Sequence, residues 1–162
     1  MGLDGLLRLL EATSVATAIR ENETLFPWIE SLHVLAIALV VGSIAIVDLR
    51  LVGLASLERG IARLTADVLP WTWAAFALAA VSGALLFSSN AFNYAHNAWF
   101  QAKFALLLLA GVNMSAFHLL VGREVEGRGA RIAGAISLAV WVCVVVCGRW
   151  TGFTIHATPL GS

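Results

Sequence analysis

Charged side chains are scarce in this 162-residue chain. They make up 12% of the residues, about half of the roughly 25% that is usual in a soluble globular domain. Apolar side chains make up 60%, too many for a soluble fold of this size to cover with polar groups. The formal net charge is zero, so there is no sign of the basic surface that would bind nucleic acid. The composition therefore predicts one domain that lies in a membrane.

The chain has few cysteines, and its N-terminal segment does not have the pattern expected of a cleavable signal peptide. Cys143 and Cys147 are the only two cysteines, and they lie inside an apolar run instead of forming a disulfide framework. Residues 1–23 lack the basic start, short apolar core and cleavage site of a signal peptide. Leucines recur there at helical spacing between charged residues. We therefore expect residues 1–23 to form one amphipathic helix on the membrane surface.

Long apolar segments dominate the rest of the chain. Four of them are separated by short polar breaks: about 27–57, 64–87, 98–121 and 132–155. Each exceeds the roughly 20 residues that a helix needs to cross the hydrocarbon of a bilayer. Strands are excluded, because an open sheet leaves unpaired backbone groups in lipid. The predicted fold is all-α: an integral membrane four-helix bundle with an N-terminal interfacial helix, one domain over residues 1–162.

Arginines in the loops predict the orientation. They flank the first and the third predicted loop, at Arg50, Arg59, Arg63, Arg123, Arg128 and Arg131. Basic loops stay on the cytoplasmic side. Both termini and the loop 88–97 are therefore expected on the periplasmic side of a bacterial inner membrane.

Ionisable side chains within predicted spans gather in the outer half of the bundle. His33 and Lys103 lie five to six residues into the first and third spans, a shared depth of about 8–9 Å at 1.5 Å per residue. Three more residues are expected near them: His96, which opens the third span, His156, which ends the fourth, and Arg149. Intramembrane ionisable groups are costly and mark functional sites. Lys103 and Arg149 suit an anionic partner such as a carboxylate or a propionate.

Soft ligand atoms form a second pattern. Met114 and His118 lie one turn apart in the third span, and Cys143 and Cys147 one turn apart in the fourth. These are either small or flexible packing residues or a stepping path for a soft metal such as Cu(I). Both interpretations stay open. Glycines such as Gly83, Gly111 and Gly134 permit close approach of helices, or leave room for a flat ligand.

Two sequence stretches resemble known membrane families. The run from His33 to Gly42 and the tract from Trp99 to Lys103 are similar to the copper-resistance D family and to the HemJ-type protoporphyrinogen oxidases. Arg50 roughly matches an arginine of the latter. Val40 and Gln101 stand where these families carry a tryptophan and, in the HemJ type, a histidine. The segment 25–30 is also similar to the start of uncharacterised bacterial four-helix membrane proteins.

This resemblance implies a b-type haem held in the bundle, with His33 as an axial ligand of the iron. His156 is the best-placed second ligand, His96 the next, and His118 a deeper alternative. Lys103 and Arg149 would then pair with the propionates or with an anionic substrate. Haem iron accepts imidazoles from two helices of a bundle, which is compatible with this arrangement.

Three functions follow as hypotheses. The first is a haem b protein that transfers electrons, or an oxidoreductase, with a quinone or a periplasmic redox protein as its partner beside the lipid bilayer. The second is a copper-handling membrane protein that uses the soft residues for passage. The third is a non-catalytic membrane subunit of a complex. Glycine-lined faces would also permit a homo-oligomer.

Overall fold

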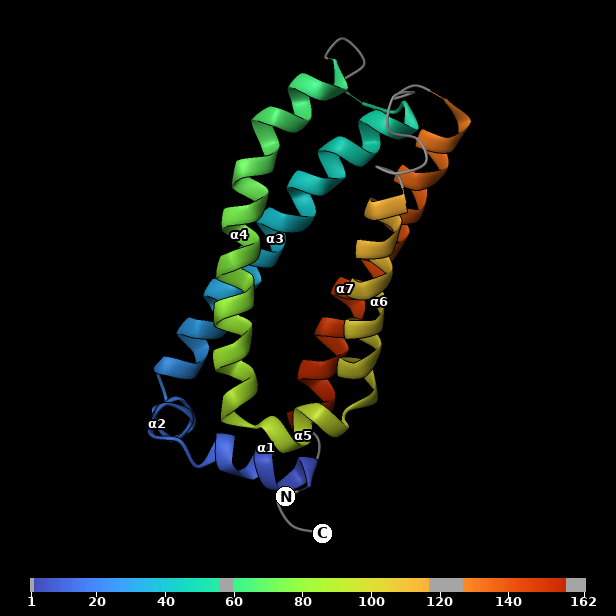
Figure 1. Cartoon of the computed structure of the whole chain (residues 1–162). Helices are drawn as coiled ribbons and strands as arrows, with labels where there is room; N and C mark the ends of the chain where they lie inside the picture. Colours follow the sequence, from blue (N-terminus) through green and yellow to red (C-terminus); the bar gives the residue numbers. More distant parts are fainter. Residues whose placement is uncertain (1, 56–59, 117–126, 157–162) are drawn as a thin grey trace.

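Helices make up nearly all of the structure. The computed structural model describes residues 2–55, 60–116 and 127–156, and for residues 61, 62 and 156 it describes the backbone alone. Within these ranges there is no strand, so the predicted all-α class is confirmed. Four long helices run side by side, and three short ones lie across one end of them (Figure 1).

The long helices are α3 (Leu25–Val52), α4 (Ile61–Ser89), α6 (Ala98–Ala116) and α7 (Arg128–His156). In the described part of the chain, three segments are long and apolar enough to cross a membrane: Leu25–Val52, Arg63–Ser89 and Arg128–Ile155. The third predicted span, 98–121, coincides with α6 at its start, and residues 117–121 lie outside the described residues. The second and fourth spans are slightly longer than predicted.

Gly53 ends α3 earlier than expected. Its φ of 88° is left-handed, a conformation that glycine adopts without steric cost. The N–H groups of Gly53 and Leu54 both bond back to the carbonyl of Leu49, at 3.1 and 2.9 Å, and so satisfy the end of the helix. The predicted continuation of the first span to residue 57 is therefore wrong, because Gly53 terminates the helix after Val52.

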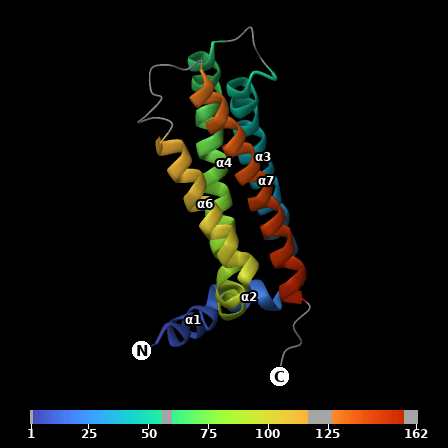
Figure 2. The same cartoon turned by 90° about the vertical axis from the view of Figure 1, so that its right-hand side faces the viewer.

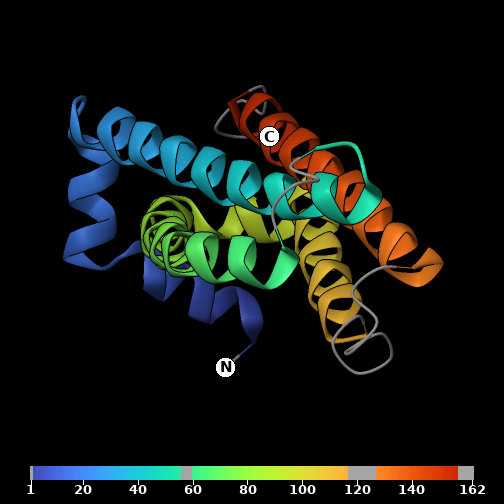
Figure 3. The same ribbon diagram turned by 90° about the horizontal axis from the view of Figure 1, so that it is seen from above.

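The long helices pack as a chain of neighbours. α4 packs on α3, α3 on α7, and α7 on α6, whereas α6 makes no close backbone approach to α3 or α4 within the described residues. The view from above shows the two pairs, α3 with α4 and α6 with α7 (Figure 3). The side of the bundle between α4 and α6 is thus not closed by helix packing.

The N-terminal segment is two helices, not one. α1 (Leu3–Glu11) and α2 (Ser14–Glu21) lie across the end of the bundle where α3 begins and α7 ends (Figure 2). The single predicted helix over residues 1–23 is wrong because Thr13 starts a new one: its Oγ1 accepts a hydrogen bond from the N–H of Ala16 at 3.3 Å. Leu7 is buried, while the leucines Leu3, Leu6 and Leu9 stay exposed.

A short helix occupies the loop predicted over residues 88–97. This helix, α5 (Ala91–His96), is followed by Asn97, whose Oδ1 accepts hydrogen bonds from the N–H groups of Trp99 and Phe100. Asn97 thus caps the start of α6. His96 consequently ends α5, and the prediction that it opens the third long helix is wrong.

Gly134 sets the contact between α3 and α7. A Cβ at this position would lie 3.0 Å from the backbone oxygen of Asp48 and 3.0 Å from Cβ of Leu51. Neither atom belongs to the flexible end of a side chain, so the two helices would have to separate. The close approach depends on the missing side chain.

We expect Gly134→Ala to lower the free energy of unfolding by about 1–3 kcal/mol, the usual cost of overpacking a close contact. Gly111→Ala on α6 is the matched control, since nothing lies within 4 Å of the added Cβ. It should gain up to about 1 kcal/mol from helix propensity. Unfolding of the detergent-solubilised protein, followed by circular dichroism, measures both. Equal stability of the two variants would contradict the assigned role of Gly134.

Candidate functional site

His33 points from α3 toward α4 and is half-buried. Its Nδ1 lies 3.0 Å from Oγ of Ser82, and the Ser82 hydroxyl donates to the carbonyl of Leu78 at 2.6 Å. Because the serine hydrogen is used on that carbonyl, Nδ1 of His33 must be the donor to Oγ. The carbonyl of Ala79 faces the same ring. The network selects the imidazole tautomer that has its free lone pair on Nε2.

Gly83 makes room for this ring. A Cβ on Gly83 would lie 2.9 Å from Cε1 of His33, closer than real Cβ contacts occur. The Cε1 atom of the imidazole therefore lies directly against α4 at Gly83. The sequence analysis named Gly83 for close approach of helices or for room for a flat ligand, and it missed Ser82. A serine–glycine pair inside an apolar run is the signal that could have found both.

Lys103 shares the interior with His33. Its stem packs on α7, where a Cβ on Gly148 would be 3.7 Å from Cδ. Nζ lies 5.2 Å from the ring centre of Phe100 and 5.8 Å from that of Phe104, within cation–π range. The positive charge of Lys103 acts electrostatically on the imidazole of His33. These two predicted residues therefore lie within electrostatic range of each other, although no contact joins their side chains among the described residues.

A cluster of aromatic rings lies between α4 and α6, at the end of the bundle where α5 is found. Phe87 of α4 stacks on Phe100 of α6, with ring centres 5.5 Å apart and planes 12° apart. Tyr94 of α5 lies 6.2 Å from Phe87 and 5.4 Å from Phe100. Burial raises the pKa of the Tyr94 hydroxyl, and the negative charge of Glu30 adds to this increase. These rings thus provide contacts across the side between α4 and α6 near this end.

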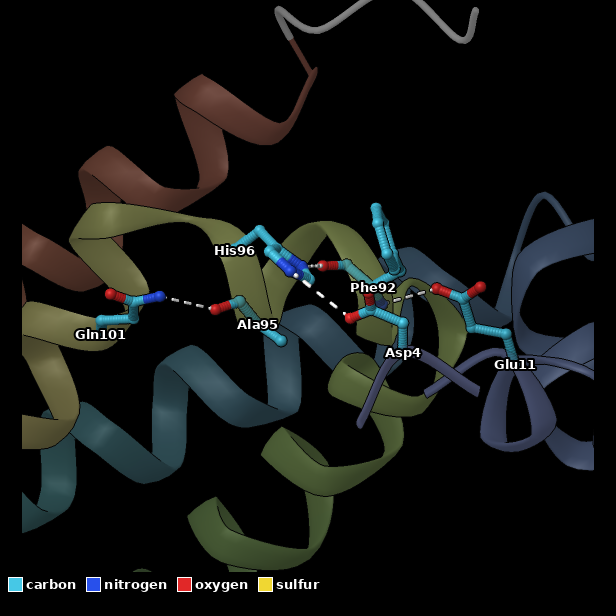
Figure 4. A network of polar contacts seen from close by, with 6 residues as sticks. All are labelled: Asp4, Glu11, Phe92, Ala95, His96 and Gln101. Atoms are coloured by element: carbon cyan, nitrogen blue, oxygen red, sulfur yellow. Dashed lines mark hydrogen bonds and ion pairs between the residues drawn. The ribbon is translucent and has the colours of Figure 1, made fainter. Parts of the chain in front are cut away.

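His96 belongs to a different contact, at the exposed end of the bundle (Figure 4). Its Nδ1 lies 2.9 Å from the carbonyl oxygen of Phe92, and its Nε2 lies 3.6 Å from Oδ1 of Asp4. Glu11 fastens α1 beside it by accepting a hydrogen bond from the N–H of Phe92 at 2.8 Å. Both ring nitrogens of His96 thus have neighbours in α5 and α1, away from the polar pair His33 and Lys103.

The remaining predicted site residues are dispersed or lie outside the description. Arg149 is exposed on α7 and stacks on Phe153, 4.5 Å from the ring centre, so it does not turn inward beside Lys103. His156 ends α7 at the same end of the bundle as His33, and its side chain is outside the description. His118 lies outside the described residues.

The predicted soft ligands that lie within the described residues, Met114, Cys143 and Cys147, do not form a cluster. Met114 is exposed on α6, Cys143 is exposed on α7, and Cys147 is buried one turn later. Both cysteines are free. Among the described residues, no three His, Cys, Asp or Glu side chains lie close enough to hold a metal ion.

Asp48 is a buried ionisable residue that the sequence analysis missed. Only 5% of its surface is exposed, although it lies near the end of an apolar helix. The signal was present, since an acidic residue inside a predicted span is uncommon. The sequence analysis used the neighbouring Arg50 to predict the orientation and assigned no role to Asp48.

Comparison with known proteins yields one match. No curated protein and no solved structure matches the chain. The model of a family of unknown function, DUF6644, matches residues 23–154, from just before α3 almost to the end of α7. The match takes in His33, Ser82, Gly83, Lys103 and Asp48 and leaves out α1 and α2. The chain therefore belongs to the DUF6644 family of unknown function.

Proposed function

We propose that this chain is a membrane protein that binds haem b through His33 and transfers electrons. The observation that carries the proposal is the hydrogen bond between Nδ1 of His33 and Oγ of Ser82. A histidine that ligates a metal usually donates its other ring N–H to a neighbouring acceptor, which fixes the tautomer and the ring orientation. Here Nε2 would be the ligand atom. A haem would supply one-electron exchange at this position.

The surroundings of His33 suit such a group. Lys103 offers a cation for an anionic propionate, and the rings of Phe100 and Phe104 beside its ammonium form an apolar wall. The side of the bundle between α4 and α6 is not closed by helix packing in the described residues. A flat, largely apolar group could enter there from the lipid.

The second axial ligand would come from α7. His156 is the preferred residue because α7 packs on α3 and ends at the same end of the bundle. His96 would first have to leave Asp4 and the carbonyl of Phe92. The alternative of copper handling would instead use the sulfur ligands Met114, Cys143 and Cys147, and a role as a non-catalytic subunit would need neither group.

We further propose that α3, α4, α6 and α7 all span a bacterial inner membrane, with α1, α2 and α5 on the periplasmic side. The long helices expose large apolar side chains along their lengths, such as Leu39, Phe76, Leu108 and Val142. Arg50, Arg63, Arg128 and Arg131 lie in the parts of α3, α4 and α7 that are remote from the short helices. Basic residues at one end indicate the cytoplasmic side.

The haem proposal predicts specific effects of three substitutions. Protein purified with haem should show a Soret band that shifts on reduction with dithionite. His33→Ala should abolish retention of haem, because it removes the ligand. Ser82→Ala should weaken retention by about 10- to 100-fold, the usual cost of losing the partner that orients a metal ligand. Gly83→Ala should displace the ring and perturb the spectrum. Absorption spectra and the haem-to-protein ratio measure all three.

His96→Ala is the matched control, because the ring nitrogens of His96 are engaged in the contact between α5 and α1. Its spectrum should equal that of the parent. An unchanged spectrum for His33→Ala would overturn the ligand assignment. A colourless protein that retains stoichiometric copper would support copper handling, and one that retains neither would support the subunit role.

The orientation predicts which cysteines a membrane-impermeant maleimide can label in intact spheroplasts. In a background in which Cys143 and Cys147 are replaced by serine, Glu23→Cys should react from outside. Gly127→Cys should react only after the membrane is permeabilised. Both positions are exposed, so accessibility within the protein does not limit the reaction. The reverse pattern would invert the topology, and labelling of both in intact spheroplasts would contradict an odd number of spans between them.

A further inference from the structure

Asp48 is a buried ionisable group far from the polar pair at His33 and Lys103. It lies 15 residues after His33 on α3, about 22 Å along the helix axis. Only 5% of its surface is exposed. It therefore belongs to neither the haem site proposed above nor the exposed charges at the cytoplasmic end of the bundle.

The carboxyl group of Asp48 is held at the contact between α3 and α7. The side chain of Ser137 on α7 lies close enough to act on this carboxyl group. The second carboxyl oxygen, Oδ2, is buried without any hydrogen-bond partner. Gly134, one turn before Ser137, packs against the backbone oxygen of Asp48, so the two helices are close together at this level.

Within the described residues, no cation forms an ion pair with this carboxyl group. The charged side chains on the elements packed here are Arg50 on α3, Arg63 and Asp67 on α4, and Arg128 and Arg131 on α7. None of them forms an ion pair with Asp48 in the described residues, and the four on α4 and α7 are exposed. An ionised Asp48 would be an unpaired anion in apolar surroundings, which is strongly unfavourable.

A proton satisfies this arrangement better than a metal ion. Hard cations require six or more oxygen ligands, whereas Asp48 belongs to no group of three His, Cys, Asp or Glu side chains that could hold a metal ion among the described residues. Addition of a proton to Oδ2 removes the charge and converts an unpartnered acceptor into a hydroxyl group that can donate. Asp48 lies four residues before Val52, the last residue of α3, so the proton would exchange with water at the cytoplasmic end.

We propose that Asp48 is a proton-binding site in the α3–α7 contact, with Ser137 as its hydrogen-bonding partner. The carboxylate takes up one proton from water on the inner side and becomes a neutral carboxyl group, which the folded protein carries at neutral pH. The site acts independently of any haem at His33, because the two are separated by four turns of helix.

Infrared spectroscopy of the full-length protein in detergent tests this proposal directly. A protonated carboxyl group absorbs at higher frequency than the amide and carboxylate bands, and its band shifts in D₂O. We expect this band at neutral pH in the parent protein and its loss in Asp48→Asn. Asp67→Asn is the matched control: the residue type is the same, the position is at a similar level on α4, and its side chain is exposed. It should keep the band.

The pH dependence provides a second measurement that needs no variant. Raising the pH should remove the band and lower the thermal stability of the parent, because deprotonation leaves a buried anion. Asp48→Asn should lack this part of the pH dependence. Absence of the band at neutral pH in folded parent protein overturns the proposal. So does a band that persists in folded Asp48→Asn or disappears in Asp67→Asn. If Asp48→Asn fails to fold, the titration of the parent band decides.

Discussion

Polar side chains on apolar helices must find hydrogen-bond partners without water, and the structure depends on how they do so. Hydroxyl groups return their hydrogens to the backbone of their own helix: Ser82 to Leu78, and Thr151 to Cys147. The oxygen then remains able to accept from a neighbouring helix. His33 uses Ser82 in this way across the contact between α3 and α4. A second bond, from Thr72 to Ser43, joins the same helices deeper in the bundle. These bonds fix the mutual register of α3 and α4.

Helix α6 does not take part in these bonds and lies at the edge of the bundle. It contacts α7 and α5 but not the backbone of α3 or α4 in the part of the chain that is described. The rings around Lys103 are therefore joined to α4 by side-chain contacts at one end, whereas helix packing holds α6 on α7 alone among the long helices. Within the described residues, the bundle thus consists of α4, α3, α7 and α6 packed in that order, and the side between α4 and α6 is not closed by helix packing.

The sequence predicted what depends on local apolarity. The helical class and the positions of the long helices followed from runs that exceed the thickness of a bilayer. Helix ends were predicted less well because single side chains decide them: Gly53 ends α3, Thr13 divides the N-terminal segment, and Asn97 begins α6. For the candidate site, depth along a helix placed His33 and Lys103 at the same end of the bundle, where α3 and α6 begin. Depth could not give the direction in which a side chain points, so Arg149 and His96 were placed inward, whereas the structure has both exposed.

Asp48 has a consequence for biosynthesis. The partners of α3 are made at very different times: Ser82 follows His33 by 49 residues, but Ser137 follows Asp48 by 89. During translation α3 emerges first, and its histidine finds a partner as soon as α4 is complete. Its aspartate must wait until α7, the last helix, has been synthesised. If α3 inserts into a membrane as proposed above, this side chain meets apolar surroundings in the interval, where a neutral, protonated form costs less than an anion. Assembly of this bundle is thus completed when α7, the C-terminal helix, packs on α3 and buries Asp48.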